Sequence, residues 1–128
     1  MTKDRKVDLN NNIYTPFIVC ENECYYIFRD DNNSKIYDSS GLYVTSLSRR
    51  ESLFLDVLMS ELDVKVNNQD ICWSLWSDDT NEIKVRSTVN CVRRKLDIIN
   101  DGLSNKIVAR NNGYAWSSEA AIVRSMLR

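Results

Sequence analysis

The stretch IKVRSTVNCVRRKLDII, residues 83–99, decides the fold because it combines an apolar helical stripe with a basic face. Its apolar residues recur at the spacing of an α-helix, in the order Val85, Val89, Val92 and Leu96. The pattern predicts a helix over residues 83–99 that packs this stripe against a core.

The opposite side of this predicted helix is polar and positively charged. At about 100° per residue it presents Ser87, Asn90, Cys91 and Arg94, with Lys84, Arg86 and Arg93 on the flanks. Basic groups separated by short polar side chains suit the major groove of double-stranded DNA. The alternative interpretation is a solvated helix face with no function.

Two further helices are predicted upstream. Ser48 and Glu51 form a capping box, and an apolar face follows that predicts a helix over residues 49–62. That face comprises Leu53, Phe54, Val57, Leu58 and Leu62. After a β-branched segment at residues 64–66, Asn67 is a candidate N-cap for a second helix over residues 68–76. The residues 77–82 then form a polar, acidic loop.

Strands are predicted on both sides of these helices. Residues 13–20, 24–29, 35–38 and 42–46 are rich in β-branched and aromatic residues, which indicates an antiparallel meander whose rings pack on a sheet face. Downstream, residues 106–110 and 113–116 flank an Asn-Gly step, which is typical of a β-hairpin. Residues 117–128 read as a short helical tail. The 128 residues fit one α+β domain, divided into parts 1–46, 47–116 and 117–128.

Charge is distributed unevenly along the chain. The formal net charge is −1, yet residues 83–116 carry seven basic and two acidic groups, and residues 47–82 carry three basic and eight acidic groups. A local basic region of this kind can give an acidic protein one side that attracts nucleic acid.

The cysteine and histidine counts restrict the chemistry of the chain. Four cysteines with no histidine favour free thiols, although Cys20 and Cys24 have a spacing that a metal site could use. Without histidine the usual general base is missing, so we expect no enzyme, no metal and no cofactor.

No apolar run reaches the roughly 18–20 residues that span a bilayer, and no signal peptide is present, so we expect a cytoplasmic protein.

Four blocks of residues carry a family resemblance. They are Leu47-Ser48-Arg49-Arg50-Glu51, Trp76, Arg93-Arg94-Lys95-Leu96 and Gly113-Tyr114. In this order, over residues 42 to 116, the chain resembles the effector domain of OmpR/PhoB-type response regulators. Only about 46 residues precede the part 47–116, so the chain is most similar to the ToxR/CadC-like branch, in which a membrane anchor would follow residue 128.

The resemblance implies a fold and a set of roles. The fold would be a winged helix-turn-helix with an N-terminal antiparallel sheet, a three-helix core and a C-terminal hairpin called the wing. The function would be sequence-specific binding of double-stranded DNA in transcription regulation, with the recognition helix at residues 83–97 in the major groove. The contact residues on that helix would be Lys84, Arg86, Ser87, Thr88, Asn90, Cys91, Arg93 and Arg94.

Further partners follow from the same resemblance. The wing at residues 107–116 would place Arg110, Asn111 and Asn112 on the adjacent minor groove or backbone. Asp78, Asp79 and Glu82 in the acidic loop would face RNA polymerase, and a second copy would bind a tandem half-site. No small-molecule substrate is implied.

Two departures from the family pattern leave the preferred DNA sequence undetermined. Cys91 stands where a long basic side chain is common, and the segment from Ile107 to Gly113 is shorter than usual. The alternative function is a winged-helix module that binds another protein and not DNA, which the acidic residues 47–82 would favour.

Overall fold

The computed structural model of the 128-residue chain describes residues 6–20, 23–30, 33–77 and 82–119. The chain divides into two compact units, Met1–Arg49 and Arg50–Arg128. Of the helical tail predicted for residues 117–128, residues 117–119 are not helical and residues 120–128 lie outside the described residues.

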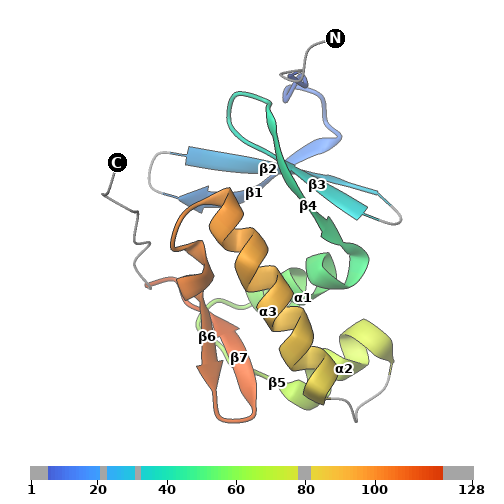
Figure 1. Cartoon of the computed structure of the whole chain (residues 1–128), viewed down its shortest axis with the longest axis vertical. Helices are drawn as coiled ribbons and strands as arrows, with labels where there is room; N and C mark the ends of the chain where they lie inside the picture. The colour runs from blue at the N-terminus through green and yellow to red at the C-terminus, as the bar shows by residue number, and fades with distance from the viewer. Residues whose placement is uncertain (1–5, 21–22, 31–32, 78–81, 120–128) are drawn as a thin grey trace. The chain divides into compact units, whose positions relative to one another are not determined.

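The first unit contains a four-stranded antiparallel sheet in the order β1-β2-β3-β4 (Figure 1). Its strands are β1 (Tyr14–Cys20), β2 (Glu23–Arg29), β3 (Asn33–Tyr37) and β4 (Tyr43–Ser48). The predicted meander is therefore confirmed. Pro16, which has no N–H to donate, is tolerated in β1 because this is an edge strand.

Successive side chains of each strand point to opposite faces of this sheet, so one set is buried and the other is more exposed. Ile18, Ile27, Ile36 and Leu47 are buried at 0–4% exposure. The aromatic residues pack ring against ring: the Tyr14 and Tyr37 centroids lie 5.3 Å apart, and Tyr37 lies 6.1 Å from Tyr43. Burial and the two neighbouring tyrosines raise the pKa of Tyr37. Packing on the sheet face explains why these aromatic residues occur here.

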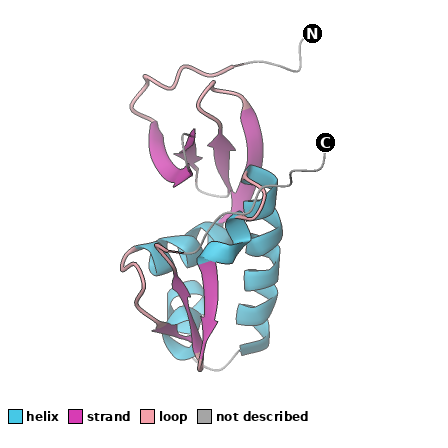
Figure 2. Ribbon diagram, turned by 90° about the vertical axis from the view of Figure 1, so that its left-hand side faces the viewer, coloured by secondary structure: helices cyan, strands magenta, loops and turns pink. Residues whose placement is uncertain are grey.

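The second unit contains three α-helices and a small sheet among its described residues. The helices are α1 (Arg49–Met59), α2 (Asn68–Trp76) and α3 (Glu82–Ile99), with a short 3₁₀ turn η1 (Leu103–Lys106). The sheet has the order β5-β7-β6, with β5 (Val66–Asn67), β6 (Ile107–Arg110) and β7 (Gly113–Trp116). In Figure 2 the hairpin of β6 and β7 runs beside α3.

Helix α3 buries the stripe that its sequence period predicts, but α1 matches its predicted face only in part. Of that face Leu53 and Val57 are partly exposed, and Leu55 is buried although the prediction did not include it. Phe54, Leu55 and Leu58 of α1 and Ile71, Cys72 and Leu75 of α2 are buried. So are Val85, Val89, Val92 and Leu96 of α3, which confirms the helical phase of the 83–99 stretch. No helix in the described part of the chain is long and apolar enough to cross a membrane.

The end of α1 differs from the prediction. The helix stops at Met59 and does not reach residue 62, and Leu62 is 51% exposed instead of belonging to the apolar face. The reason lies in a tertiary contact. Asp63 adopts a left-handed conformation (φ 64°), and its backbone N–H donates to the Trp116 carbonyl at 2.8 Å, which directs the chain toward β7. A neighbouring strand therefore ends the helix.

Candidate functional site

The outward face of α3 is the first part of the candidate site. Lys84, Arg86, Ser87, Asn90 and Arg94 are exposed, as the helical period predicts. Thr88, Cys91 and Arg93 are only partly exposed. The face therefore keeps three of its four predicted basic residues at the surface.

The two adjacent arginines of α3 are placed differently. Arg93 is half-buried, and its Nη2 donates to the Ile107 carbonyl of β6 at 2.9 Å. Its Nε is buried and, within the described residues, has no hydrogen-bond acceptor. Arg94 is exposed. Arg93 thus connects α3 to the small sheet, and Arg94 belongs to the outward face.

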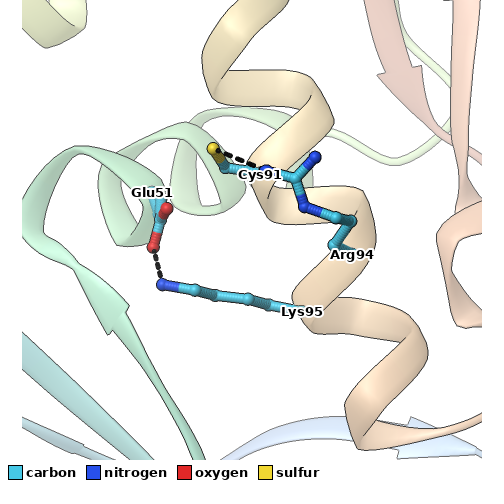
Figure 3. Close-up of polar contacts among 4 residues, drawn as sticks. All are labelled: Glu51, Cys91, Arg94 and Lys95. Carbon is cyan, nitrogen blue, oxygen red and sulfur yellow. Dashed lines mark hydrogen bonds and ion pairs between the residues drawn. The ribbon is translucent and has the colours of Figure 1, made fainter.

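Two polar contacts on the central turns of α3 appear in Figure 3. Arg94 Nη2 donates to the Cys91 sulfur at 3.4 Å, so the thiol is partly covered by a basic side chain. Lys95 Nζ lies 2.7 Å from Glu51 Oε1 of α1, and this ion pair connects the two helices. An ion pair with a largely buried carboxylate orients α3 relative to α1.

Sequence reasoning did not identify the cluster at the first turn of α3. The Lys84 ammonium lies 5.7 Å from the Trp76 ring centroid, and the Arg50 guanidinium lies 5.4 Å from the same ring. Arg50 Nε also donates to the Leu75 carbonyl at 3.2 Å. One residue from each helix therefore meets at this indole. Arg50 and Trp76 both belong to the blocks that carry the family resemblance, and this was the sequence feature that could have identified the cluster.

The β6–β7 hairpin is the second part of the candidate site. Arg110 pairs with Gly113, so Asn111 and Asn112 form a two-residue loop, and Asn112 takes a left-handed conformation (φ 59°) that asparagine tolerates. Arg110, Asn111 and Asn112 are all exposed. The predicted hairpin and its three candidate residues are thus at the surface.

The hairpin tip lies against the start of α2. Lys65 Nζ donates to the Asn111 carbonyl at 3.0 Å, and the Asn68 backbone N–H donates to the Asn112 carbonyl at 2.8 Å. A polar hollow at this place is lined by Lys65, Asn67, Asn68, Gln69, Glu82 and Asn112. No local sequence pattern could have paired Lys65 with Asn111, because 46 residues separate them.

The acidic loop is described only in part. Asp78 and Asp79 lie outside the described residues, whereas Glu82 is exposed in the first turn of α3. A carboxylate at a helix N-terminus stabilises the helix through its dipole. Among the residues that the structure describes, no group of three or more His, Cys, Asp or Glu side chains could hold a metal ion.

Comparison of the chain with protein-family models, with curated proteins and with solved structures finds no match. A functional assignment therefore depends on the α3 face and the hairpin tip. Together they offer exposed guanidinium and ammonium groups, short hydroxyl and amide side chains, and an exposed two-residue loop.

Proposed function

We propose that this chain is a sequence-specific DNA-binding transcription regulator of the winged-helix type, with α3 as the recognition helix and the β6–β7 hairpin as the wing. The supporting observation is that an 18-residue helix exposes a basic and short-polar face beside an exposed hairpin loop. An α-helix fits the major groove of B-form DNA, and a neighbouring narrow loop fits the minor groove.

The exposed residues of α3 divide by chemistry into two roles. Lys84, Arg86 and Arg94 supply affinity, because each cation that meets a phosphate releases a counterion. Ser87 and Asn90 supply selectivity, because short hydroxyl and amide groups reach base edges without holding the helix away from the groove floor. Arg93 contributes indirectly, by connecting α3 to β6.

Further partners belong to the same proposal. RNA polymerase would contact the acidic segment before α3. A second copy of the chain would bind a tandem half-site on the DNA. The protein would act in the cytoplasm. Both partners come from the family resemblance. Of the three candidate polymerase contacts, Glu82 is the described one, and it is exposed in the first turn of α3.

A second candidate function, a module that binds protein and not DNA, is favoured by one observation. Trp73 of α2 is 54% exposed and Ile83 of α3 is 78% exposed. Exposed aromatic side chains such as Trp73 are enriched at protein interfaces. The net charge of −1 adds to this candidate.

Duplex binding at two salt concentrations separates the two candidates. With a fluorescent duplex of random sequence, we expect the apparent Kd to weaken steeply between about 50 and 200 mM salt, because several phosphate contacts are lost. Selection from a randomised duplex pool should then enrich one sequence. Absence of any salt-dependent duplex binding would leave the protein-binding module as the better assignment.

The same assay tests selectivity through Asn90. Asn90→Ala removes an uncharged, exposed side chain, so binding to the random duplex and its salt slope should not change. Binding to the selected sequence should weaken about 5- to 150-fold, the cost of one lost base contact. Equal weakening on both duplexes would mean that Asn90 supports general affinity and does not read a base.

A further inference from the structure

The two carbonyl groups of the hairpin loop are both bound by the segment that leads into α2. The Asn111 carbonyl accepts from Lys65 Nζ at 3.0 Å, and the Asn112 carbonyl accepts from the Asn68 backbone N–H at 2.8 Å. The loop itself contains only these two residues. Its backbone position is therefore set from outside the hairpin.

The exposed Lys65 side chain lies beside the hairpin at two points, its Cγ near Gly113 and its Nζ at the Asn111 carbonyl. β5 pairs with β7, with Val66 opposite Tyr114 and Asn67 opposite Gly113. A Cβ added to Gly113 would collide with the Val66 carbonyl and would lie 3.0 Å from Lys65 Cγ. Gly113 is thus the residue that lets this strand and the Lys65 stem approach, and the ammonium then reaches the loop carbonyl.

We propose that Lys65 is a positioning residue of the wing, which fixes the loop so that the Asn111 and Asn112 side chains are presented to the minor groove. The inference rests on the proposed DNA-binding function. Both asparagines are exposed while their carbonyls are bound. Amide groups can donate to the acceptors on the minor-groove edges of bases. A pre-positioned loop loses less conformational entropy on binding than a mobile one.

This role differs measurably from that of an ordinary phosphate-binding lysine. A lysine on a phosphate releases about one counterion, so its removal lowers the salt slope of binding by about 1. A lysine that donates to a backbone carbonyl of its own protein contributes to DNA affinity only by fixing the conformation of the loop. Its removal should weaken binding and leave the slope unchanged. Lys65→Met keeps an unbranched stem but loses both the donor and the charge, and Lys65→Arg keeps both.

The first experiment needs no DNA and uses the full chain. Amide hydrogen exchange at Asn68 reports the bond from its N–H to the Asn112 carbonyl. We expect Lys65→Met to accelerate this exchange about threefold to tenfold, the loss of one exposed hydrogen bond. Lys65→Arg should restore protection. Lys35→Met, an equal loss of charge at an exposed residue of β3, should leave amide exchange at Asn68 unchanged. Unchanged exchange in Lys65→Met would overturn the inference.

The second experiment measures duplex binding against salt for Lys65→Met and Arg110→Met. We expect Lys65→Met to bind about threefold to tenfold more weakly with the wild-type slope, and Arg110→Met to lower the slope by about 1. A lowered slope for Lys65→Met, or wild-type affinity despite faster Asn68 exchange, would show that Lys65 does not position the wing. Wild-type protein that binds no duplex would contradict the proposed function, while the exchange result would still report whether Lys65 holds the loop.

Discussion

Arg93 and Arg94 are neighbours in the chain but have different environments. Arg93 is half-buried and donates to the Ile107 carbonyl, whereas Arg94 is exposed and contacts the Cys91 sulfur. A helix turns by about 100° per residue, so adjacent side chains face different surroundings. The charge of a residue therefore does not establish whether it stabilises the fold or binds a ligand.

Single alanine substitutions should separate these two roles. Arg93→Ala removes a charged donor from a partly buried carbonyl, so we expect the free energy of unfolding to fall by about 1–3 kcal/mol. Arg94→Ala should leave unfolding nearly unchanged and should lower the salt slope of duplex binding by about 1. Urea denaturation and anisotropy titrations measure the two quantities. Equal stability losses in both variants would contradict the assignment of Arg94 to the outward face.

The four cysteines provide a second test at single-residue resolution. Cys20 and Cys72 are 1% exposed and should react with an alkylating agent only on unfolding. Cys24 and Cys91 are partly exposed and should react in the native protein. Saturating duplex should slow labelling of Cys91 on α3 and leave labelling of Cys24 on β2 unchanged, as peptide mass spectrometry would show. Unchanged labelling of Cys91 at saturating duplex would remove α3 from the interface, and equal protection of both thiols would indicate general shielding and no defined interface.

At the scale of elements, the connection from α1 to β5 is joined to the end of β7 by one carboxylate. Asp63 accepts the Ser118 hydroxyl at 2.5 Å and the Ser118 backbone N–H at 3.0 Å. These two hydrogen bonds, the hydroxyl first, lower the pKa of Asp63 below its usual value of 3.8. The same aspartate donates its N–H to Trp116 and ends the helical path of α1.

The lowered pKa of Asp63 predicts a pH dependence. A group whose pKa is lower in the folded state contributes stability above its unfolded pKa, and this contribution is lost as the pH falls through the folded value. Acidification below about pH 4 should therefore destabilise the protein through this group. Ser118→Ala should raise the pKa of Asp63 toward 3.8, measured by NMR titration of its carboxyl carbon. An unchanged pKa in Ser118→Ala would mean that other groups set it.

At the scale of the whole molecule, a chain of net charge −1 can attract DNA only if its charges are segregated. Residues 83–116 supply seven basic and two acidic groups, while residues 47–82 supply three basic and eight acidic groups. Exposed charges further apart than about 8 Å are largely screened at physiological salt. The position of each charge should therefore matter more than the total.

Two charge reversals with the same net charge test this statement. Arg86→Glu on α3 and Lys35→Glu on β3 each change the net charge by the same amount, and both side chains are exposed. At about 150 mM salt we expect Arg86→Glu to weaken duplex binding by tenfold or more and Lys35→Glu to change it less than twofold. Similar losses in both variants would indicate a general charge effect and no defined interface.

The sequence by itself determined the helices and the hairpin of the second unit and the buried face of α3, but not the full buried face or the end of α1. The spacing of Val85, Val89, Val92 and Leu96 predicted the buried stripe of α3. The Asn-Gly step predicted the hairpin, although the two loop residues are Asn111 and Asn112 and the glycine belongs to β7. These predictions hold because helical periodicity and turn geometry depend on neighbouring residues in the chain. The strands of the first unit followed from β-propensity in the same way, with ends displaced by one to a few residues.

Only the tertiary structure decided how the elements meet and which side chains remain available. It assigned Arg93 to β6, ended α1 through the bond from Asp63 to Trp116, and placed Lys65 on the loop carbonyl of Asn111. Each of these contacts joins residues that are distant in the chain, so its geometry depends on the packing of whole elements. A local pattern cannot contain that information, because the same side chain can serve the fold or the surface according to what packs beside it.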